Sequence, residues 1–284
     1  GVGGVGSWAA EALARSGVAE LTLIDLDHVA ESNVNRQVHA LETTLGQAKV
    51  LAMRERIAQI NPDCQVDCIE EFITTENVAS LLPVCNAVID CIDQVKAKAA
   101  LVAHCKRNKL PVVTTGGAGG RTDPTRIRID DLSRTTQDAL ASKLRAQLRK
   151  EYGFPRDAKK KFGVPCVFSD EQIRRPQTQA CDLDEAGLHG LNCAGYGSSV
   201  AVTAAFGMVA AGEAIARARA RAHAGTGAAS AIDILIPPSI AFIVYSVLVP
   251  GASVPAMFAA GMMPGILVGL SMMVPAVWLS RRHR

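Results

Sequence analysis

The feature that most constrains folding is a stretch from Ile234 to Ser280 without a single Asp, Glu, Lys, Arg or His, 47 residues in all. A stretch of this length exposes far more apolar surface than a water-soluble monomer tolerates, so it aggregates or enters a membrane. The preceding 233 residues mix charged and apolar residues in the usual way. The sequence therefore predicts two parts, residues 1–223 and 231–284, joined by a Gly/Ala/Ser-rich linker at 224–230.

Strand and helix patterns alternate over the first part. Apolar residues recur at helical spacing after the opening glycines, and Gly17 fits the position just past that helix. Further helices are expected at 47–61, 95–107, 138–150 and 198–222, strands at 21–24, 66–68, 87–90, 110–115 and 126–130, and loops over 151–195. This order predicts an α/β fold, a Rossmann-like, mostly parallel sheet with helices on both faces.

The first six residues, Gly1-Val2-Gly3-Gly4-Val5-Gly6, satisfy the pattern G-x-G-x-x-G at the start of a helix. Glycines there let the backbone approach phosphate oxygens, and free helical N–H groups stabilise the anion. Asp25, at the end of the next strand, is placed to accept hydrogen bonds from ribose hydroxyls. By itself this pattern fits an NAD-type Rossmann domain equally well.

Three later motifs favour ATP chemistry over hydride transfer: Ser32–Gln37, Gly46–Lys49 and Asp90–Asp93. A reaction that breaks the α–β bond of ATP needs cations such as Arg36 and Lys49, because charge builds on the leaving pyrophosphate. A carboxylate beside those phosphates would hold Mg²⁺. Asp93 fits that role, although it could also cap the following helix. Asp90 is better interpreted as a structural residue at a strand end.

In this order, the motifs GxGGxG, DxD, SNxxRQ, GQxK and DxxD resemble those of the ThiF/MoeB, ubiquitin-activating-enzyme-like adenylating superfamily. The resemblance implies a homodimer that uses ATP and Mg²⁺, with a strand preceding Gly1 and a partner's basic residue completing the site. It implies that Arg36, Lys49 and Asp93 are catalytic and that Asp93 holds the metal. The nucleotide-binding residues it implies are Gly1, Gly3, Gly4, Gly6, Asp25, Asn33, Arg36, Lys49 and Asp93.

Three further segments are similar to the bacterial tRNA threonylcarbamoyladenosine dehydratases: residues 114–120, 163–169 and 193–198. This resemblance covers about residues 1–222 and implies a cytoplasmic enzyme that cyclises the modified adenosine through an acyl adenylate. A sulfur-carrier or ubiquitin-like activator is the alternative within the superfamily. Sulfur-carrier activators usually carry paired C-x-x-C zinc ligands, and none of the eight cysteines forms such a pair, so no zinc is expected.

A basic segment supports a tRNA substrate independently, with eleven Lys and Arg against five Asp and Glu between Arg134 and Arg175. Phosphates could meet its cations, and an exposed base could stack on its aromatic rings. A solvated helix face with ordinary core aromatics is the alternative. Cys166 is expected to be buried and structural. The residues predicted to contact tRNA are Lys143, Arg149, Lys159, Lys160 and Lys161.

The apolar part contains two runs, residues 234–249 and 256–279, separated by Pro250 and Gly251. The second run, as a helix of roughly 36 Å, would cross a bilayer. Residues 231–284 resemble part of the large permease subunit of TRAP-type transporters. A fused reading frame is the favoured explanation, and an enzyme tethered to the inner membrane by a helical hairpin over 234–280 is the second. The third functional hypothesis is that the chain is a component of a membrane transporter, defined by its apolar part.

Overall fold

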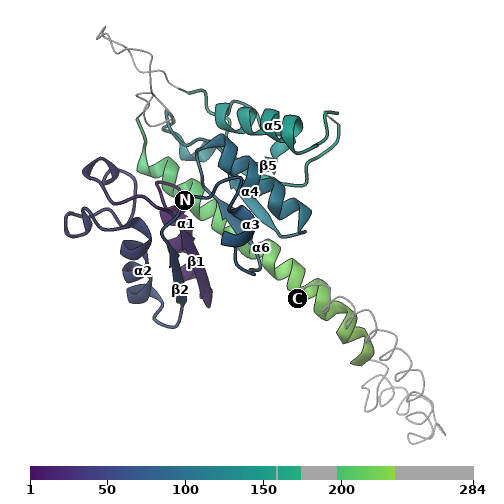
Figure 1. Ribbon diagram of the computed structural model, residues 1–284, viewed down its shortest axis with the longest axis horizontal. Helices are drawn as coiled ribbons and strands as arrows, with labels where there is room; N and C mark the ends of the chain where they lie inside the picture. Colours follow the sequence, from purple (N-terminus) through teal and green to yellow (C-terminus); the bar gives the residue numbers. More distant parts are fainter. Residues whose placement is uncertain (158, 174–196, 234–284) are drawn as a thin grey trace, which may run out of the picture. The chain divides into compact units, whose positions relative to one another are not determined.

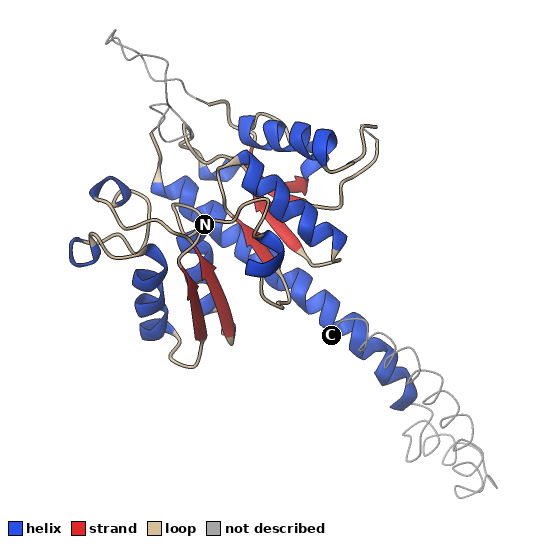
Figure 2. Cartoon of the chain, in the orientation of Figure 1, coloured by secondary structure: helices blue, strands red, loops and turns tan. Residues whose placement is uncertain are grey.

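The computed structural model describes residues 1–157, 159–173 and 197–233, with backbone alone for 222–233 (Figure 1). The chain divides into two compact units, Gly1–Ala218 and Arg219–Arg284. The first unit contains every strand that the structure describes, as Figure 2 shows. The predicted hairpin over 234–280 and the predicted end of the loop-rich stretch lie outside the described residues.

Six strands form two hydrogen-bonded sheets in the described residues. In the smaller sheet β1 (Glu20–Ile24) pairs in parallel with β2 (Gln65–Ile69). The larger sheet has the order β3-β4-β6-β5: β3 (Val88–Asp90), β4 (Val112–Thr115) and β6 (Pro165–Ser169) run parallel. The edge strand β5 (Ile127–Asp131) is antiparallel to β6. The predicted mostly parallel α/β fold is confirmed.

Helices cover both faces of the larger sheet because alternate residues of each strand point to opposite sides. On one face α4 (Val95–Arg107) and α5 (Ala139–Glu151) pack against Val112, Cys166 and Phe168. On the other face α6 (Val200–Asp233) packs against Val113 and Val167. The smaller sheet packs with α1 (Gly6–Arg15) and α2 (Lys49–Ile60). Alpha-helix α3 (Val78–Leu81) is a single turn.

The helix α6 is a core helix over its first half. Val202, Phe206 and Ala210 are fully buried against the sheet. A Cβ at Gly207 would lie 2.4 Å from the Val5 carbonyl oxygen, so this glycine permits close approach to α1. By length and composition Val200–Arg221 could cross a membrane. The burial of its first half against the larger sheet is typical of a core helix in a globular domain.

Two sequence expectations were wrong. The flexible linker predicted at 224–230 lies within α6, because its alanines continue the helix and its glycines do not end it. The stretch 151–195, predicted to be loops, contains β6, which occupies the interior of the larger sheet. All five residues of β6 are buried, so the strand has no alternation of polar and apolar residues to reveal it. Gly17, in contrast, follows α1 with φ +75°, as predicted.

Candidate functional site

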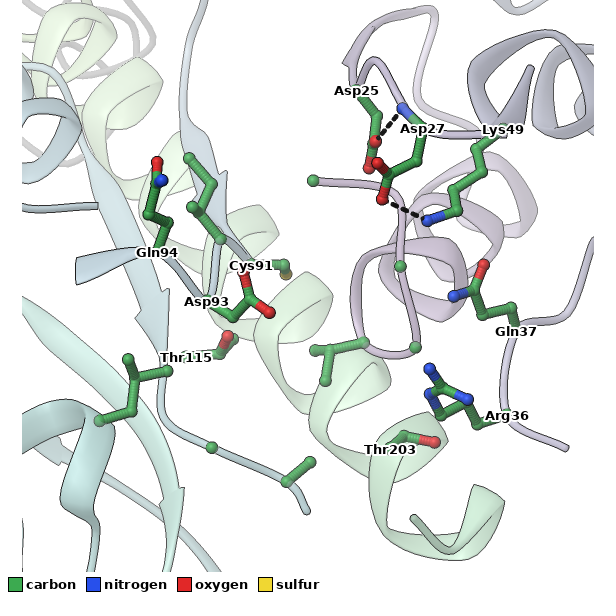
Figure 3. Close-up of a pocket in the computed structure, with 18 of the residues that line it drawn as sticks. Asp25, Asp27, Arg36, Gln37, Lys49, Cys91, Asp93, Gln94, Thr115 and Thr203 are labelled. Carbon is green, nitrogen blue, oxygen red and sulfur yellow. Dashed lines mark hydrogen bonds and ion pairs between the residues drawn. The ribbon is translucent and has the colours of Figure 1, made fainter. Parts of the chain in front are cut away.

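A pocket with a cavity volume of about 460 Å³ opens at the carboxyl ends of β1, β3 and β4 (Figure 3). This is the edge at which parallel α/β sheets bind ligands. Eight of the nine residues predicted to bind nucleotide line it, from three separate parts of the sequence. They are Gly1, Gly3, Gly4, Asp25, Asn33, Arg36, Lys49 and Asp93.

The ninth, Gly6, does not line the pocket and supports the glycine loop from behind. A Cβ on Gly6 would lie 1.9 Å from the Gly1 carbonyl oxygen, which no side chain tolerates. A Cβ on Gly1 would meet the Cys91 carbonyl oxygen at 3.2 Å, and one on Gly4 would meet the Arg36 side chain at 3.3 Å. The loop therefore forms a cradle of bare backbone that side chains would fill, which fits a phosphate chain.

Asp25 fixes the position of the cradle. Its buried carboxylate accepts a 2.6 Å hydrogen bond from the Val2 amide and a 2.9 Å bond from the Asp27 amide. Asp27 in turn forms an ion pair with Lys49, with 2.7 Å between Lys49 Nζ and Asp27 Oδ2. The Lys49 side chain is nearly buried and that of Asp27 is half-exposed. This pair holds the ammonium group at the pocket wall, as Figure 3 shows.

Asn33 ends the 3₁₀ helix Glu31–Asn33, and Arg36 lies in the turn that follows it. The Arg36 guanidinium donates to the Ser32 carbonyl oxygen at 2.6 Å and to Asn35 Oδ1 at 2.9 Å. Partial burial lowers the pKa of Arg36 below its usual value. Asn33 Oδ1 accepts from the Ala30 amide at 3.1 Å, which closes the turn. These bonds orient a cation toward the glycine cradle.

Gln37 and His39 are buried beside this cation cluster, and each has a polar side-chain atom without a hydrogen-bond partner among the described residues. Gln37 lines the pocket and is 5% exposed, and its Oε1 has no hydrogen-bond partner among the described residues. Both ring nitrogens of His39 likewise lack a partner there. Burial, reinforced by the charge of Lys49, lowers the pKa of His39 to about 4.

Asp93 faces the cradle from the end of β3 (Figure 3). It is exposed and makes no capping bond, because Gln94 holds the N-cap position of α4 and the helix has no side-chain cap. Asp90 is instead fully buried: it pairs with Lys98 Nζ at 3.0 Å and accepts from Thr114 Oγ1 at 2.6 Å. Asp90 is therefore structural, as predicted, and Asp93 is the carboxylate open to a ligand.

An uncharged wall of the pocket lies beside Asp93, across from Arg36 and Lys49 (Figure 3). Thr115, the backbone of Gly116–Gly119 and Leu140 form it, and Ser198 and Thr203 also line the pocket. Beneath the glycines, Asp138 Oδ2 accepts from the Gly117 amide at 3.0 Å and pairs with the fully buried Arg121 at 3.2 Å. A Cβ at Gly116 would lie 2.2 Å from that same oxygen.

Sequence reasoning missed the pair of Arg121 and Asp138. Arg121 directly follows the predicted glycine run, and that adjacency was the available signal. Asp138 is also the N-cap residue of α5, because its Oδ1 accepts a 2.8 Å hydrogen bond from the Ala141 amide. Cys91 lines the pocket too, but burial raises the pKa of its thiol, so it is a poor nucleophile.

None of the five predicted tRNA-binding residues lines the pocket. Lys143, Lys159, Lys160 and Lys161 are exposed, whereas Arg149 donates to the Pro155 carbonyl oxygen and covers the Phe162 ring. Of the aromatic rings in the basic segment, Phe162 and Phe168 are buried in the core and are therefore closed to base stacking. Cys166 is fully buried and structural, and burial raises its pKa, as predicted.

Comparison with known families gives two matches. Residues 1–235 match the ThiF family, which is most of the chain. Residues 194–284 match the DctM component of tripartite ATP-independent periplasmic transporters, about a third of the chain. The two matches overlap over 194–235, a range that includes the whole of α6.

Individual relatives agree with the first match. The chain is 51% identical over 221 residues to the tRNA threonylcarbamoyladenosine dehydratase of Escherichia coli (strain K12), covering 76% of this chain and 82% of that one. It is 49% identical over 218 residues to the enzyme of the same name from Haemophilus influenzae, with the same coverage. The solved structure of the E. coli enzyme in complex with ATP is similar with a TM-score of 0.70, covering 78% of this chain and 84% of that one at 49% identity.

Proposed function

The chain belongs to the ThiF family, and from this premise we propose that it cyclises threonylcarbamoyladenosine in tRNA at the expense of ATP. One observation carries the proposal: a single pocket joins the glycine cradle and its cations to an uncharged wall where an acyl group can lie. The relatives that cover most of the chain bear the name of this activity. The pocket fits ATP for two reasons. The glycine cradle leaves room for phosphate groups against the backbone, and Gln37 Oε1 is left to accept a hydrogen bond from a donor on the nucleotide.

In the first step a carboxylate oxygen of the threonyl group attacks the α-phosphorus of ATP. The bond from that phosphorus to the bridging oxygen breaks, and pyrophosphate leaves with the electron pair. Arg36 and Lys49 line the same pocket as the glycine cradle, which supports a role for both cations in stabilising the negative charge that builds on the leaving pyrophosphate. Lys49 exchanges its partner Asp27 for phosphate oxygens in this step.

In the second step the carbamoyl group of the same nucleotide attacks the activated acyl carbon. The bond from that carbon to the AMP oxygen breaks, one proton is released and the ring closes. Because the nucleophile is tethered to the acyl carbon, the enzyme has only to position it. The uncharged wall of Thr115 and residues 116–119 suits this role, since it offers the acyl adenylate no competing charged group.

Magnesium fits the site as a partner of the nucleotide. Mg²⁺ is commonly held by one or two carboxylates together with substrate phosphates, and Asp93 supplies such a carboxylate at the pocket. No cluster of three or more His, Cys, Asp or Glu occurs in the part of the chain that the structure describes. The bound ion would neutralise phosphate charge as pyrophosphate leaves.

The test uses tRNA that carries threonylcarbamoyladenosine. Purified protein, ATP and Mg²⁺ should convert that nucleoside to a product lighter by one water, with one AMP formed per product, as measured by nucleoside mass spectrometry. Reactions without ATP are the control. If instead pyrophosphate exchange required a small carrier protein with a free carboxyl terminus and tRNA stayed unchanged, the protein would be a carrier activator and the proposal would fail.

Association and localisation belong to the same proposal. A homodimer is expected from the resemblance, and sedimentation of the purified chain at several concentrations tests it. We place the catalytic part in the cytoplasm, where tRNA is available, with residues 234–280 in the inner membrane if they are translated with the enzyme. Membrane fractionation after carbonate washing tests that placement.

A further inference from the structure

Two neighbouring helices begin at the pocket and end at one basic surface. Ala97 in the first turn of α4 and Leu140 in the first turn of α5 both line the pocket. The last turns carry Lys106 and Arg107 on α4, and Arg149 and Lys150 on α5. Figure 1 shows the two helices lying together on the same face of the larger sheet.

Specific contacts bring the two helix ends to one place. The Arg107 guanidinium covers the Tyr152 ring at 5.5 Å, and Arg149 covers Phe162 at 5.3 Å. Lys106 Nζ donates to the Gly163 carbonyl oxygen at 3.3 Å. The loop that follows α5 is thereby held against the end of α4, although more than forty residues separate them in sequence.

The joined surface is strongly positive. We call residues 104–109 and 149–161 the helix-end surface; it contains nine Lys and Arg but only two acidic residues, Glu151 and Asp157. Eight of its nine cations are exposed, Arg149 being half-buried. The exposed members are Lys106, Arg107, Lys109, Lys150, Arg156, Lys159, Lys160 and Lys161.

We propose that the helix-end surface binds the phosphate backbone of RNA several nucleotides away from the reacting nucleotide, with α4 and α5 setting the distance between the two. This inference rests on the proposed function and adds the α4 end, which the sequence did not associate with RNA. From Ala97 to Arg107 the helix rises about 15 Å. A stacked strand advances about 3.4 Å per nucleotide, so the surface meets phosphates roughly four or five nucleotides from the one in the pocket.

The contacts also indicate how the RNA is recognised. Arg107 already occupies one face of the Tyr152 ring, and the Phe162 ring is buried beneath Arg149, so neither ring is an open platform for stacking bases. Recognition is therefore of backbone charge, which is independent of sequence and depends on salt. An acidic protein or an anionic membrane would satisfy the same charge, but neither would also place a nucleotide in the pocket.

The experiment compares Lys106→Glu with Arg54→Glu in the complete chain. Both residues are exposed, both substitutions change the net charge equally, and Arg54 lies on α2, away from the helix-end surface. Binding of tRNA and of its anticodon stem-loop is measured by fluorescence anisotropy at several salt concentrations. ATP binding is measured in parallel.

Lys106→Glu should weaken RNA binding about fivefold and lower the salt slope by about one, while Arg54→Glu and ATP binding stay near wild type. If both variants weakened binding equally, only net charge would matter and the surface would be rejected. If Lys106→Glu bound RNA normally while the wild type still cyclised tRNA, the surface would be wrong and the proposed function would stand. If the wild type cyclised no tRNA yet bound anionic vesicles or an acidic protein through Lys106, both proposals would fail.

Discussion

The two walls of the pocket differ in whether charged side chains reach the cavity. We call the wall with Arg36 and Lys49 the phosphate wall, and the uncharged wall with Thr115 and residues 116–119 the acyl wall. On the phosphate wall Arg36 and Lys49 present their charges to the cavity, and Asp93 faces them from the end of β3 (Figure 3). On the acyl wall the charges of Arg121 and Asp138 lie beneath the glycine loop, fully buried, and only backbone and small side chains reach the cavity. In the proposed function, this arrangement would place charge where the phosphate bond breaks and keep it away from the acyl group.

The difference predicts different failures. The exposed carboxylate of Asp93 contributes little to folding, since exposed charges are worth at most about 1 kcal/mol. The buried charges of Arg121 and Asp138 are structural, since removing one partner leaves the other buried and unpaired. Variants of Asp93 should therefore lose activity but stay folded, and variants of Arg121 or Asp138 should lose stability first.

The largest expected effect is at Asp93. Asp93→Ala should lower ATP-dependent turnover about a thousandfold or more, because metal neutralisation of the leaving group is worth several kcal/mol. The melting temperature should stay unchanged, since Asp93 is exposed and caps no helix. Formation of AMP is the measurement, with thermal melting as the folding control. Near-normal turnover in the folded variant would remove Asp93 from the site.

The next effect is at the acyl wall. Asp138→Ala should cost about 3–5 kcal/mol of unfolding free energy, because it leaves the Arg121 guanidinium buried and unpaired. Part of this cost is the lost cap of α5. Chemical denaturation measures the free energy of unfolding. The control is the double variant Arg121→Met with Asp138→Asn, which should lose less unfolding free energy than removal of either charge alone. An additive loss would mean that the two side chains do not interact energetically.

The contrast also explains what the sequence could predict. The phosphate wall was predictable because Gly1–Gly6, Arg36 and Lys49 lie in short motifs whose spacing carries the chemistry. The acyl wall was not, because Arg121, Asp138 and Leu140 meet only through tertiary packing. The strand β6 was missed for a related reason: burial on both faces leaves no periodic pattern. The helical course of residues 224–230 was missed because composition alone suggested a linker.

A third effect should appear in the pH dependence of stability. The unfolded chain protonates His39 near pH 6.5, whereas the folded chain binds no proton there until about pH 4. The unfolded state therefore binds more protons in this window, so stability falls as the pH drops from 6.5 to 4. His39→Gln should make the unfolding free energy less dependent on pH. By pH 4 the variant should have lost about 2–3 kcal/mol less of its unfolding free energy than the wild type, as measured by denaturant titrations. His104→Gln is the control, and an equal flattening there would contradict the assignment.

A smaller effect concerns the unpartnered oxygen of Gln37. We expect a donor on the bound nucleotide or its water to satisfy this oxygen, so Gln37→Leu should raise the KM for ATP roughly tenfold. Stability should hold or rise, because the substitution removes an unsatisfied buried acceptor. Steady-state kinetics and thermal melting together separate the two effects. A large drop in melting temperature with unchanged KM would make Gln37 a structural residue only.

The smallest effect is expected from a truncation between the first part of the chain and the uncharged residues 234–280. The last buried side chain of α6 in the described residues is Ala214, and the exposed arginines at 217, 219 and 221 follow it. A chain ending at Gly225 therefore keeps every packed residue of the unit Gly1–Ala218, and its melting temperature and ATP turnover should match those of the complete chain. Its solubility without detergent should improve, because residues 234–280 carry no charge and expose too much apolar surface. If truncation lowered turnover while the complete chain stayed soluble and monomeric, the apolar part would be packing on the enzyme, and the separation of the chain into two parts would be wrong.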